Sequence, residues 1–343
     1  MTTVARTADL TALGDFTPPY ADWRAAMADA VTDAAELCRL LNLPPSVAQI
    51  PRAAGSFPLL VPRTFLGRIR PGDPVDPLLL QVLPRMLEDS SPPHFTTDPV
   101  CDAEATCLPG LLGKYRGRLL MLTTGACGVH CRFCFRRHLL HRVVPLTTEP
   151  CKEVLARIAR DAMIREVILS GGDPLTLGDA SLLRIVNQLA KIPHINRLRL
   201  HTRLPIMIPS RVTDLLVTGL GGTRLTAFVV IHTNHPAEID ESVARALSRF
   251  TSGGITLLSQ TVLLKDINDR VETLVELFER LVQLRIVPYY LHQLDRVTGA
   301  AHFEVPEQIG IRLIEELRAR LPGYAVPRYV RETPLGAYKE VIA

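Results

Sequence analysis

Apolar and amphipathic segments alternate from residue 118 onward, and this alternation limits the folds open to the chain more than any other feature. The apolar segments, each of strand length, are Arg118–Thr124, Glu166–Ser170, Arg197–Thr202, Leu225–His232, Ile255–Leu264 and Val287–Leu291. The segments with helical spacing are Glu149–Met163, Ala180–Ala190, Ser210–Leu220, Glu238–Phe250, Val271–Leu284 and Pro306–Arg320. Alternating strands and helices form parallel βα units with right-handed crossovers. The chain is therefore predicted to be an α/β protein whose ligands lie at the carboxyl ends of its strands.

The segment before this alternation has a different pattern. Helical spacing predicts helices over residues 21–42, 62–69 and 76–88. The stretch from Ser90 to Gly113 is rich in Ser, Pro and Thr, which is typical of an extended connection. A chain of 343 residues can hold one large domain and a smaller lobe, so we expect residues 1–112 to form a helical lobe.

Three cysteines follow the first predicted strand at intervals of four and three residues: Cys127, Cys131 and Cys134. Thiolates are soft ligands that favour iron–sulfur clusters or zinc. Three ligands for a four-iron cube leave one iron open, and an open iron can bind a substrate as the open position of a catalytic zinc does. The alternative is a zinc site with His130 or His138 as the fourth ligand.

Charge and composition exclude several classes of partner. The 39 basic and 35 acidic residues give a net charge of only +4, which argues against a nucleic-acid binder. A local basic stretch is expected to be solvated or to bind an anion, because no aromatic residues suited to base stacking are interleaved with it. Its members are Arg132, Arg136, Arg137, His138, His141 and Arg142.

Seven cysteines, an odd number without a regular framework, fit a reducing compartment. The first residues lack the apolar core of a signal peptide, and no apolar run approaches the length of a membrane span. We therefore expect a cytoplasmic protein without membrane or nucleic-acid partners.

Other candidate ligands stand at the ends of later predicted strands. Gly171 and Gly172 let the backbone approach a ligand closely, and Asp173 offers a carboxylate to a cationic amino group, although the same residues also make a simple turn. Three further polar residues stand at strand ends: Arg203, His232 and Gln260. Taken alone, each would sooner be given a structural role than a catalytic one.

The cysteine spacing, with Phe133 beside the last thiol, resembles the signature of the radical S-adenosylmethionine (SAM) enzymes. The resemblance implies a partial six-stranded (β/α)6 barrel with a 4Fe–4S cluster on Cys127, Cys131 and Cys134. In that family the open iron binds SAM and a Gly-Gly-Asp element binds its amino group. The residues that the resemblance assigns to SAM are Gly171, Gly172, Asp173, Arg203, His232 and Gln260.

Longer segments resemble the lysine 2,3-aminomutases, radical SAM enzymes that also carry pyridoxal 5′-phosphate (PLP). These segments are His232–Glu238, Gln260–Asp269 and Gly323–Pro327. The segments that look most like the branch supplying the (R)-β-lysyl group of bacterial elongation factor P are Tyr289–Phe303, Cys134–His138 and Val61–Phe65. The resemblance covers nearly the whole chain and implies an isomerase that converts L-lysine to β-lysine. It also implies a reductase as electron donor and a separate ligase in the elongation factor P pathway.

The resemblance also assigns the PLP and substrate residues. It divides the chain into the lobe at 1–112, a core at 113–325 and a tail at 326–343 that carries Lys339, the lysine expected to bind PLP. The residues expected to bind the phosphate of PLP are Lys114, Tyr115 and Arg118. The alternatives are that Lys339 is a solvated tail lysine and that these three residues form a basic loop. Arg136, two residues after Cys134, matches the family arginine that binds the substrate carboxylate, and a guanidinium suits this bidentate contact. The ε-ammonium of lysine is expected to pair with Asp295 and Glu332.

The chain departs from the family in three places, and other functions stay open. The glycine run that precedes the PLP lysine is reduced to residues 335–338, and Glu332 replaces the aspartate of the longer enzymes, as in the elongation factor P branch. The zinc-bearing extension of some longer relatives is not matched, so no zinc is expected. The alternatives are a radical SAM aminomutase for another amino acid, a radical SAM enzyme without PLP, or a zinc site in a basic binding module.

Overall fold

A single mixed sheet runs through the protein. The computed structural model describes residues 20–48, 51–55, 57–90, 92–140, 143, 148–334 and 336–343, so the first nineteen residues of the predicted lobe lie outside it. Ten strands are hydrogen-bonded in chain order from β1 to β10. They are β1 Thr106–Leu108, β2 Leu111–Tyr115, β3 Arg118–Thr124, β4 Glu166–Gly171, β5 Arg197–Thr202, β6 Thr226–His232, β7 Thr256–Val262, β8 Ile286–His292, β9 Arg328–Arg331 and β10 Glu340–Val341. Strands β3 to β9 are parallel, and the two edges of the sheet are antiparallel.

The predicted parallel α/β alternation is confirmed, but the sheet is larger than predicted. The expected strands correspond to β3 through β8 within two residues at each end. The parallel part gains a seventh strand, β9, and the segment expected to be only an extended connection contains β1 and the start of β2. The predicted domain boundary at residue 112 falls inside β2, while the domain division itself stays a prediction.

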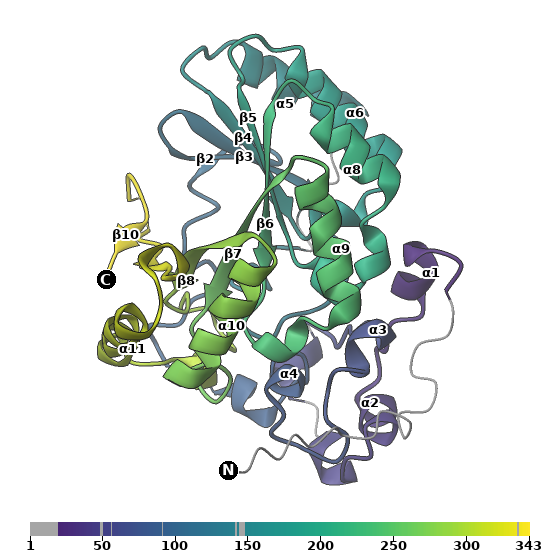
Figure 1. Ribbon diagram of the computed structural model, residues 1–343, viewed down its shortest axis with the longest axis vertical. Helices are drawn as coiled ribbons and strands as arrows, with labels where there is room; N and C mark the ends of the chain where they lie inside the picture. The colour runs from purple at the N-terminus through teal and green to yellow at the C-terminus, as the bar shows by residue number, and fades with distance from the viewer. Residues whose placement is uncertain are drawn as a thin grey trace, which may run out of the picture.

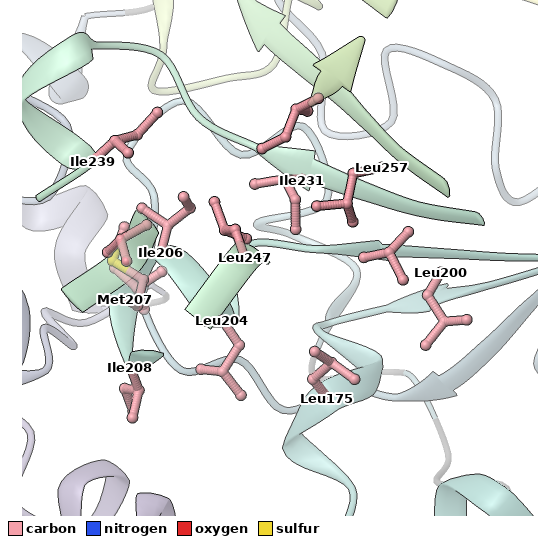
Figure 2. Packing of buried hydrophobic residues seen from close by; sticks show 14 of the residues in the cluster. Leu175, Leu200, Leu204, Ile206, Met207, Ile208, Ile231, Ile239, Leu247 and Leu257 are labelled. Carbon is pink, nitrogen blue, oxygen red and sulfur yellow. The ribbon is translucent and has the colours of Figure 1, made fainter. Parts of the chain in front are cut away.

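Helices connect successive parallel strands and cover the outer face of the sheet (Figure 1). They are α5 Thr148–Ala159, α6 Asp179–Ala190, α8 Asp214–Gly221, α9 Glu241–Ser252, α10 Val271–Gln283 and α11 Glu307–Arg320, with the short α7 Leu204–Met207 after β5. Alternate strand residues point into this layer, as the side-chain period of two in a strand requires. Figure 2 shows part of the resulting core, in which Leu200, Ile231 and Leu257 of the strands gather near Leu204 and Leu247 of the helices. Complete burial of each such side chain stabilises the fold by about 1.5–3 kcal/mol.

The N-terminal part is a set of short helices, α1 Trp23–Ala28, α2 Ala34–Leu40, α3 Arg63–Leu66 and α4 Pro77–Leu80. The prediction of one helix over 21–42 was wrong. Asp33 starts a new helix by accepting a hydrogen bond from the Glu36 amide at 2.7 Å, and Val31 forms a bridge with Val61. The buried apolar residues of these helices belong to the same hydrophobic cluster as those of the sheet.

No helix in the described part of the chain is long and apolar enough to cross a membrane.

Candidate active site

The inner face of the parallel sheet lines a cavity of about 270 Å³. Strand residues that alternate with the outer core point into it, for example Ser170 on β4, His201 on β5 and His292 on β8. Every residue assigned to a site from the sequence lines this one cavity. The strand alternation thus brings together residues of the strands β2 to β8. Loop residues complete the lining, among them Glu332, which directly follows β9, and Lys339, which directly precedes β10.

The three cysteines lie on the loop that leaves β3, and each lines the cavity. Burial raises the pKa of the Cys134 thiol to about 11, and the neighbouring Cys131 thiol adds to the effect. Positively charged iron favours the thiolate form and so fits this buried donor set. Among the described residues no three His, Cys, Asp or Glu side chains are grouped closely enough to hold a metal ion. A four-iron cube is larger than a single ion, so its ligands can stand further apart than those of zinc.

A buried carboxylate fixes the cysteine loop to the N-terminal part. Glu88 accepts hydrogen bonds from Arg132 Nε at 2.8 Å and Nη2 at 2.6 Å, and from Arg137 Nη2 at 2.6 Å. The centre of the Phe57 ring lies 4.9 Å from the Arg132 guanidinium carbon and 5.0 Å from that of Arg137. The basic stretch was expected to be solvated or to bind an anion. Arg132, Arg136 and Arg137 are buried and not solvated, and each pairs with a carboxylate of the protein itself. His141 and Arg142 lie outside the described residues.

Gly171 and Gly172 let two loops pass each other without clashing. Gly171 has φ +129°, and a Cβ atom there would lie 2.4 Å from the Thr124 carbonyl oxygen. A Cβ atom on Gly172 would lie 2.1 Å from the Ala126 carbonyl oxygen. Both glycines also line the cavity. The missing side chains therefore let the backbone pass close to the start of the cysteine loop and leave it open to a ligand in the cavity.

The carboxylate of Asp173 holds the ends of β4 and β5 together. It accepts hydrogen bonds from Thr202 Oγ1 at 2.7 Å and from the amides of Arg203, Leu204 and Leu175 at 2.7, 3.0 and 2.9 Å. These contacts use most of the acceptor capacity of one carboxylate. Asp173 therefore positions the loops around the cavity, and its assigned contact with SAM stays a prediction.

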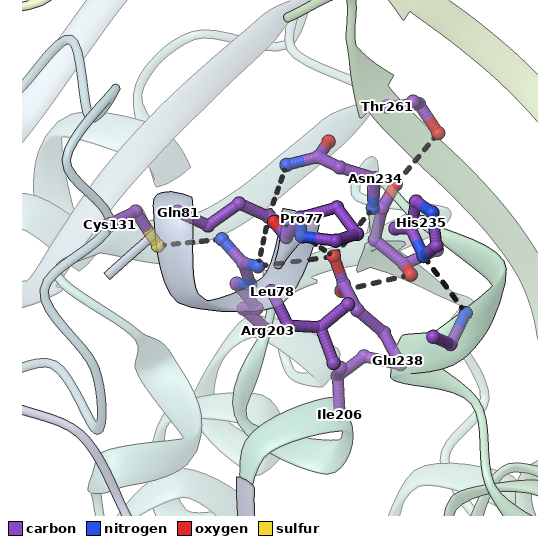
Figure 3. A network of polar contacts seen from close by, with 12 residues as sticks. Pro77, Leu78, Gln81, Cys131, Arg203, Ile206, Asn234, His235, Glu238 and Thr261 are labelled. Carbon is purple, nitrogen blue, oxygen red and sulfur yellow. Dashed lines mark hydrogen bonds and ion pairs between the residues drawn. The ribbon is translucent and has the colours of Figure 1, made fainter. Parts of the chain in front are cut away.

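Arg203 links the cysteine loop to a buried polar network (Figure 3). Its Nη1 lies 2.9 Å from Cys131 Sγ, and its Nη2 donates to Gln81 Oε1 at 2.7 Å. Glu238 takes part at 3.4 Å from Nη2 and also accepts from Gln81 Nε2 at 2.9 Å. Gln81 and Glu238 were not assigned from the sequence, because their contact with each other joins positions 157 residues apart.

Lys339, Glu332 and Tyr115 form a connected group on another wall of the cavity. The Lys339 ammonium pairs with Glu332 Oε2, and the Tyr115 hydroxyl donates to Glu332 Oε1. Burial opposes ionisation of Glu332, but the positive charge of Lys339 and the hydrogen bonds outweigh it, so the pKa of this carboxyl is lowered.

Asp102, which was not singled out in the sequence, connects two predicted binding residues. Its Oδ2 accepts from Arg136 Nε at 2.7 Å and its Oδ1 lies 2.8 Å from Lys114 Nζ. Arg136 also donates through Nη1 to Ser170 Oγ at 3.2 Å. The arginine assigned to the substrate carboxylate is thereby held in one orientation at the edge of the cavity.

Asp295 faces the cavity and has no hydrogen-bond or ion-pair partner for its side chain in the described structure. Burial raises its pKa from 3.8 to about 7, against the opposing effect of the Lys339 ammonium. A cationic group entering the cavity would lower this pKa again and hold the carboxylate ionised.

Neutral histidines line the same space. Burial lowers the pKa of His232 to about 3 and that of His201 and His292 well below 6.5. His201 and His292 were not assigned to a site, because a single histidine in a strand gives no sign of which face it points to. These rings contribute hydrogen-bonding groups without adding positive charge near Lys339.

Comparison with known proteins places the chain among radical SAM proteins. The profile of the radical SAM superfamily matches residues 121–281. The chain is 42% identical to L-lysine 2,3-aminomutase of Escherichia coli over 92% of this chain and 93% of that protein. It is 42% identical to the protein of the same name from Haemophilus influenzae, over 91% and 92% of the two chains. The L-lysine 2,3-aminomutase of Clostridium subterminale is 33% identical over 93% of this chain and 77% of its own length.

Proposed function

Because the chain belongs to the L-lysine 2,3-aminomutase family of radical SAM enzymes, and is thus an isomerase, we propose that it converts L-lysine to β-lysine with a 4Fe–4S cluster, SAM and PLP bound in the cavity. The observation that carries the proposal is the position of Lys339 on the wall of the same cavity as Cys127, Cys131 and Cys134. An amine for PLP and thiols for a cluster therefore line one cavity.

The residues around the thiols fit a cluster and SAM. Cys127, Cys131 and Cys134 would hold the cluster, and the backbone at Gly171 and Gly172 lies beside them. When bound, the cluster and SAM supply a radical that abstracts hydrogen from the substrate. The chain's contribution is to hold these groups and the substrate together in one cavity.

The part of the lining around Lys339 fits PLP. Lys339 supplies the amine, and Arg118 supplies a guanidinium that has no ion pair in the described structure. The Arg118 guanidinium carbon lies 4.5 Å from the centre of the Tyr115 ring. When bound, PLP supplies an electron-delocalising ring attached to the substrate nitrogen.

The chain's own charges then orient L-lysine. Arg136, held by Asp102, would bind the α-carboxylate, and Asp295 and Glu332 would bind the ε-ammonium. A substrate with a carboxylate in place of the ε-ammonium would meet two carboxylates and be excluded. This arrangement supports lysine over acidic amino acids.

We also propose that the β-lysine serves the modification of elongation factor P in the cytoplasm, with a separate ligase and a reductase as functional partners. The segments Tyr289–Phe303, Cys134–His138 and Val61–Phe65 support this branch of the family. All seven cysteines are free thiols, which suits a reducing compartment.

The decisive experiment is chiral product analysis after anaerobic incubation of the reconstituted protein with L-lysine, SAM, PLP and dithionite. We expect β-lysine that requires both SAM and PLP. Deoxyadenosine formed without any dependence on lysine would indicate another radical SAM reaction. One equivalent of zinc without iron or sulfide in anaerobically purified protein would instead support a structural zinc module.

A further inference from the structure

Arg199 on β5 is a cavity residue whose hydrogen-bonding capacity is only partly used. Its side chain is 11% exposed, and its Nη2 donates to Glu166 Oε1 at 2.7 Å. Its Nε is buried and has no hydrogen-bond partner in the described structure. A buried guanidinium N–H without an acceptor is costly, so its place on the cavity wall indicates an absent anionic or polar ligand.

Lys114, which was assigned to the PLP phosphate, is already engaged. Its Nζ lies 2.8 Å from Asp102 Oδ1 and donates to the Val100 carbonyl oxygen at 2.6 Å. Of the three residues assigned to the phosphate, only Arg118 offers a cation that is not paired with a described carboxylate. A phosphate dianion bound by a single arginine would keep much of its charge uncompensated.

The sheet brings Arg199 to the same end of the cavity as Arg118. Arg118 is in register with Glu166 on the next strand, and Glu166 is in register with Arg197 on β5. Arg199 lies two residues further along β5 and so points to the same face. Two strand spacings and two residues put the Cα atoms of Arg118 and Arg199 about 12 Å apart, which two long side chains can span around a tetrahedral anion.

The environment of Tyr290 agrees with this placement. Burial raises the pKa of the Tyr290 hydroxyl, and the positive charges of Arg199 and Arg118 both act in the opposite direction. Both guanidinium groups therefore lie near one cavity-lining side chain.

We infer that Arg199 is a phosphate-binding residue that forms, with Arg118, the site for the phosphate of PLP. The inference rests on the proposed function, because it takes the same cavity as the PLP site. Glu166 also lies 3.9 Å from Arg197 Nε, so one carboxylate is shared by two arginines and cannot neutralise both. The excess positive charge at this end of the cavity suits a phosphate monoester, and the guanidinium fork suits two of its oxygens.

The experiment compares two arginines of the same strand and face in the full-length protein with its cluster reconstituted. Arg199→Gln removes the arginine that lines the cavity. Arg197→Gln is the control: the Arg197 side chain also lies near Glu166, but it is 46% exposed and does not line the cavity. Binding of PLP and of pyridoxal, which lacks the phosphate, is titrated by absorbance. We expect Arg199→Gln to weaken the binding of PLP about tenfold or more with little effect on the binding of pyridoxal, since the lost contact is a hydrogen bond between two charged groups. Arg197→Gln should change the affinity for PLP and the affinity for pyridoxal by less than about twofold, because an exposed ion pair contributes little.

Equal PLP affinity in Arg199→Gln and the parent protein, or equal weakening of PLP and pyridoxal, would overturn the inference while leaving the proposed function intact. A parent protein that binds no PLP would instead overturn the proposed function. If Arg199→Gln fails to fold, the Arg199→Gln, Glu166→Gln double variant removes both charges of the pair and gives the same readout without a buried unpaired carboxylate.

Discussion

Lys339 and Glu332 pair with each other, so the lysine assigned to PLP neutralises one of the acids assigned to the substrate. If Lys339 held PLP as proposed, it would no longer present an ammonium to Glu332. The carboxylate would then be open to another cation, and the ε-ammonium of L-lysine has the same chemistry as the lysine side chain that now pairs with it. In the ligand-free protein, this ion pair balances the negative charge of the buried Glu332 carboxylate.

Replacing Lys339 by alanine should remove covalent PLP binding. The visible absorbance of PLP joined to a lysine amine should be lost in Lys339→Ala and kept in Lys191→Ala, an exposed lysine on the outer side of the sheet. Spectra of both variants after removal of free PLP provide the measurement. An unchanged spectrum in Lys339→Ala would defeat the assignment.

Replacing Glu332 by glutamine should weaken lysine binding selectively. Loss of a charged hydrogen-bond partner corresponds to roughly 1.5–3 kcal/mol, so KM for L-lysine should rise about 10- to 100-fold with a smaller change in kcat. Steady-state kinetics should show no such rise for Glu316→Gln, a surface glutamate paired with Arg320. A fall in kcat at constant KM would place Glu332 in the chemistry rather than in substrate binding.

Asp295 should make the stability of the ligand-free protein fall as pH rises. Its pKa in the folded protein, about 7, is raised above the usual 3.8, so its protonated form favours folding. That contribution is complete below about pH 4 and is lost as pH rises through 7. Urea unfolding at pH 5 and pH 8 should therefore show that Asp295→Asn stabilises the protein more at pH 8 than at pH 5, relative to the parent. The comparison cancels the opposite contribution of the buried histidines, and a pH-independent difference would contradict the assigned pKa.

A methyl group at position 172 should disrupt the cysteine loop. In Gly172→Ala the new Cβ would lie 2.1 Å from the Ala126 carbonyl oxygen, so backbone must move at the base of the loop. Iron content after reconstitution and thermal stability should both fall. Gly67→Ala is the matched control, because its Cβ would meet no atom within 4 Å, and its stability should change by less than about 0.5 kcal/mol.

Neutralising Glu88 should destabilise the protein and its cluster together. Glu88→Gln leaves Arg132 and Arg137 buried without their shared counter-charge, at a cost of about 3–5 kcal/mol. Denaturant unfolding of the apoprotein gives the stability, and iron analysis gives the cluster content. A variant with parental values of both would show that the cysteine loop does not depend on this contact.

The sequence predicted the parallel strands well because each is a buried apolar segment bounded by turns, as β3 and β5 show. It missed β1 and β9 because three- and four-residue strands carry too little apolar pattern, and β9 begins and ends with arginine. The break between α1 and α2 depends on the bridge from Val31 to Val61, which helical spacing does not reveal.

Residues that belong to a motif, such as the three cysteines, could be assigned from their spacing. All of the assigned residues line the cavity. Asp102, Glu238 and Arg199 were missed for a common reason. Each acts through a contact between segments distant in the chain, and a charged residue in a strand or loop does not reveal its partner. The side on which a strand side chain projects becomes informative only when the neighbouring strands are known.

The contacts of Glu88 also limit how far the protein can be shortened. A fragment trimmed to the parallel sheet and its helices would keep all three thiols yet discard Glu88, which pairs with Arg132 and Arg137. It would also discard Phe57, so both arginines would lose their counter-charge and part of their cover, and the loop that carries the thiols would lose its anchor. Shortened versions of this enzyme should therefore retain the segments around residues 57 and 88.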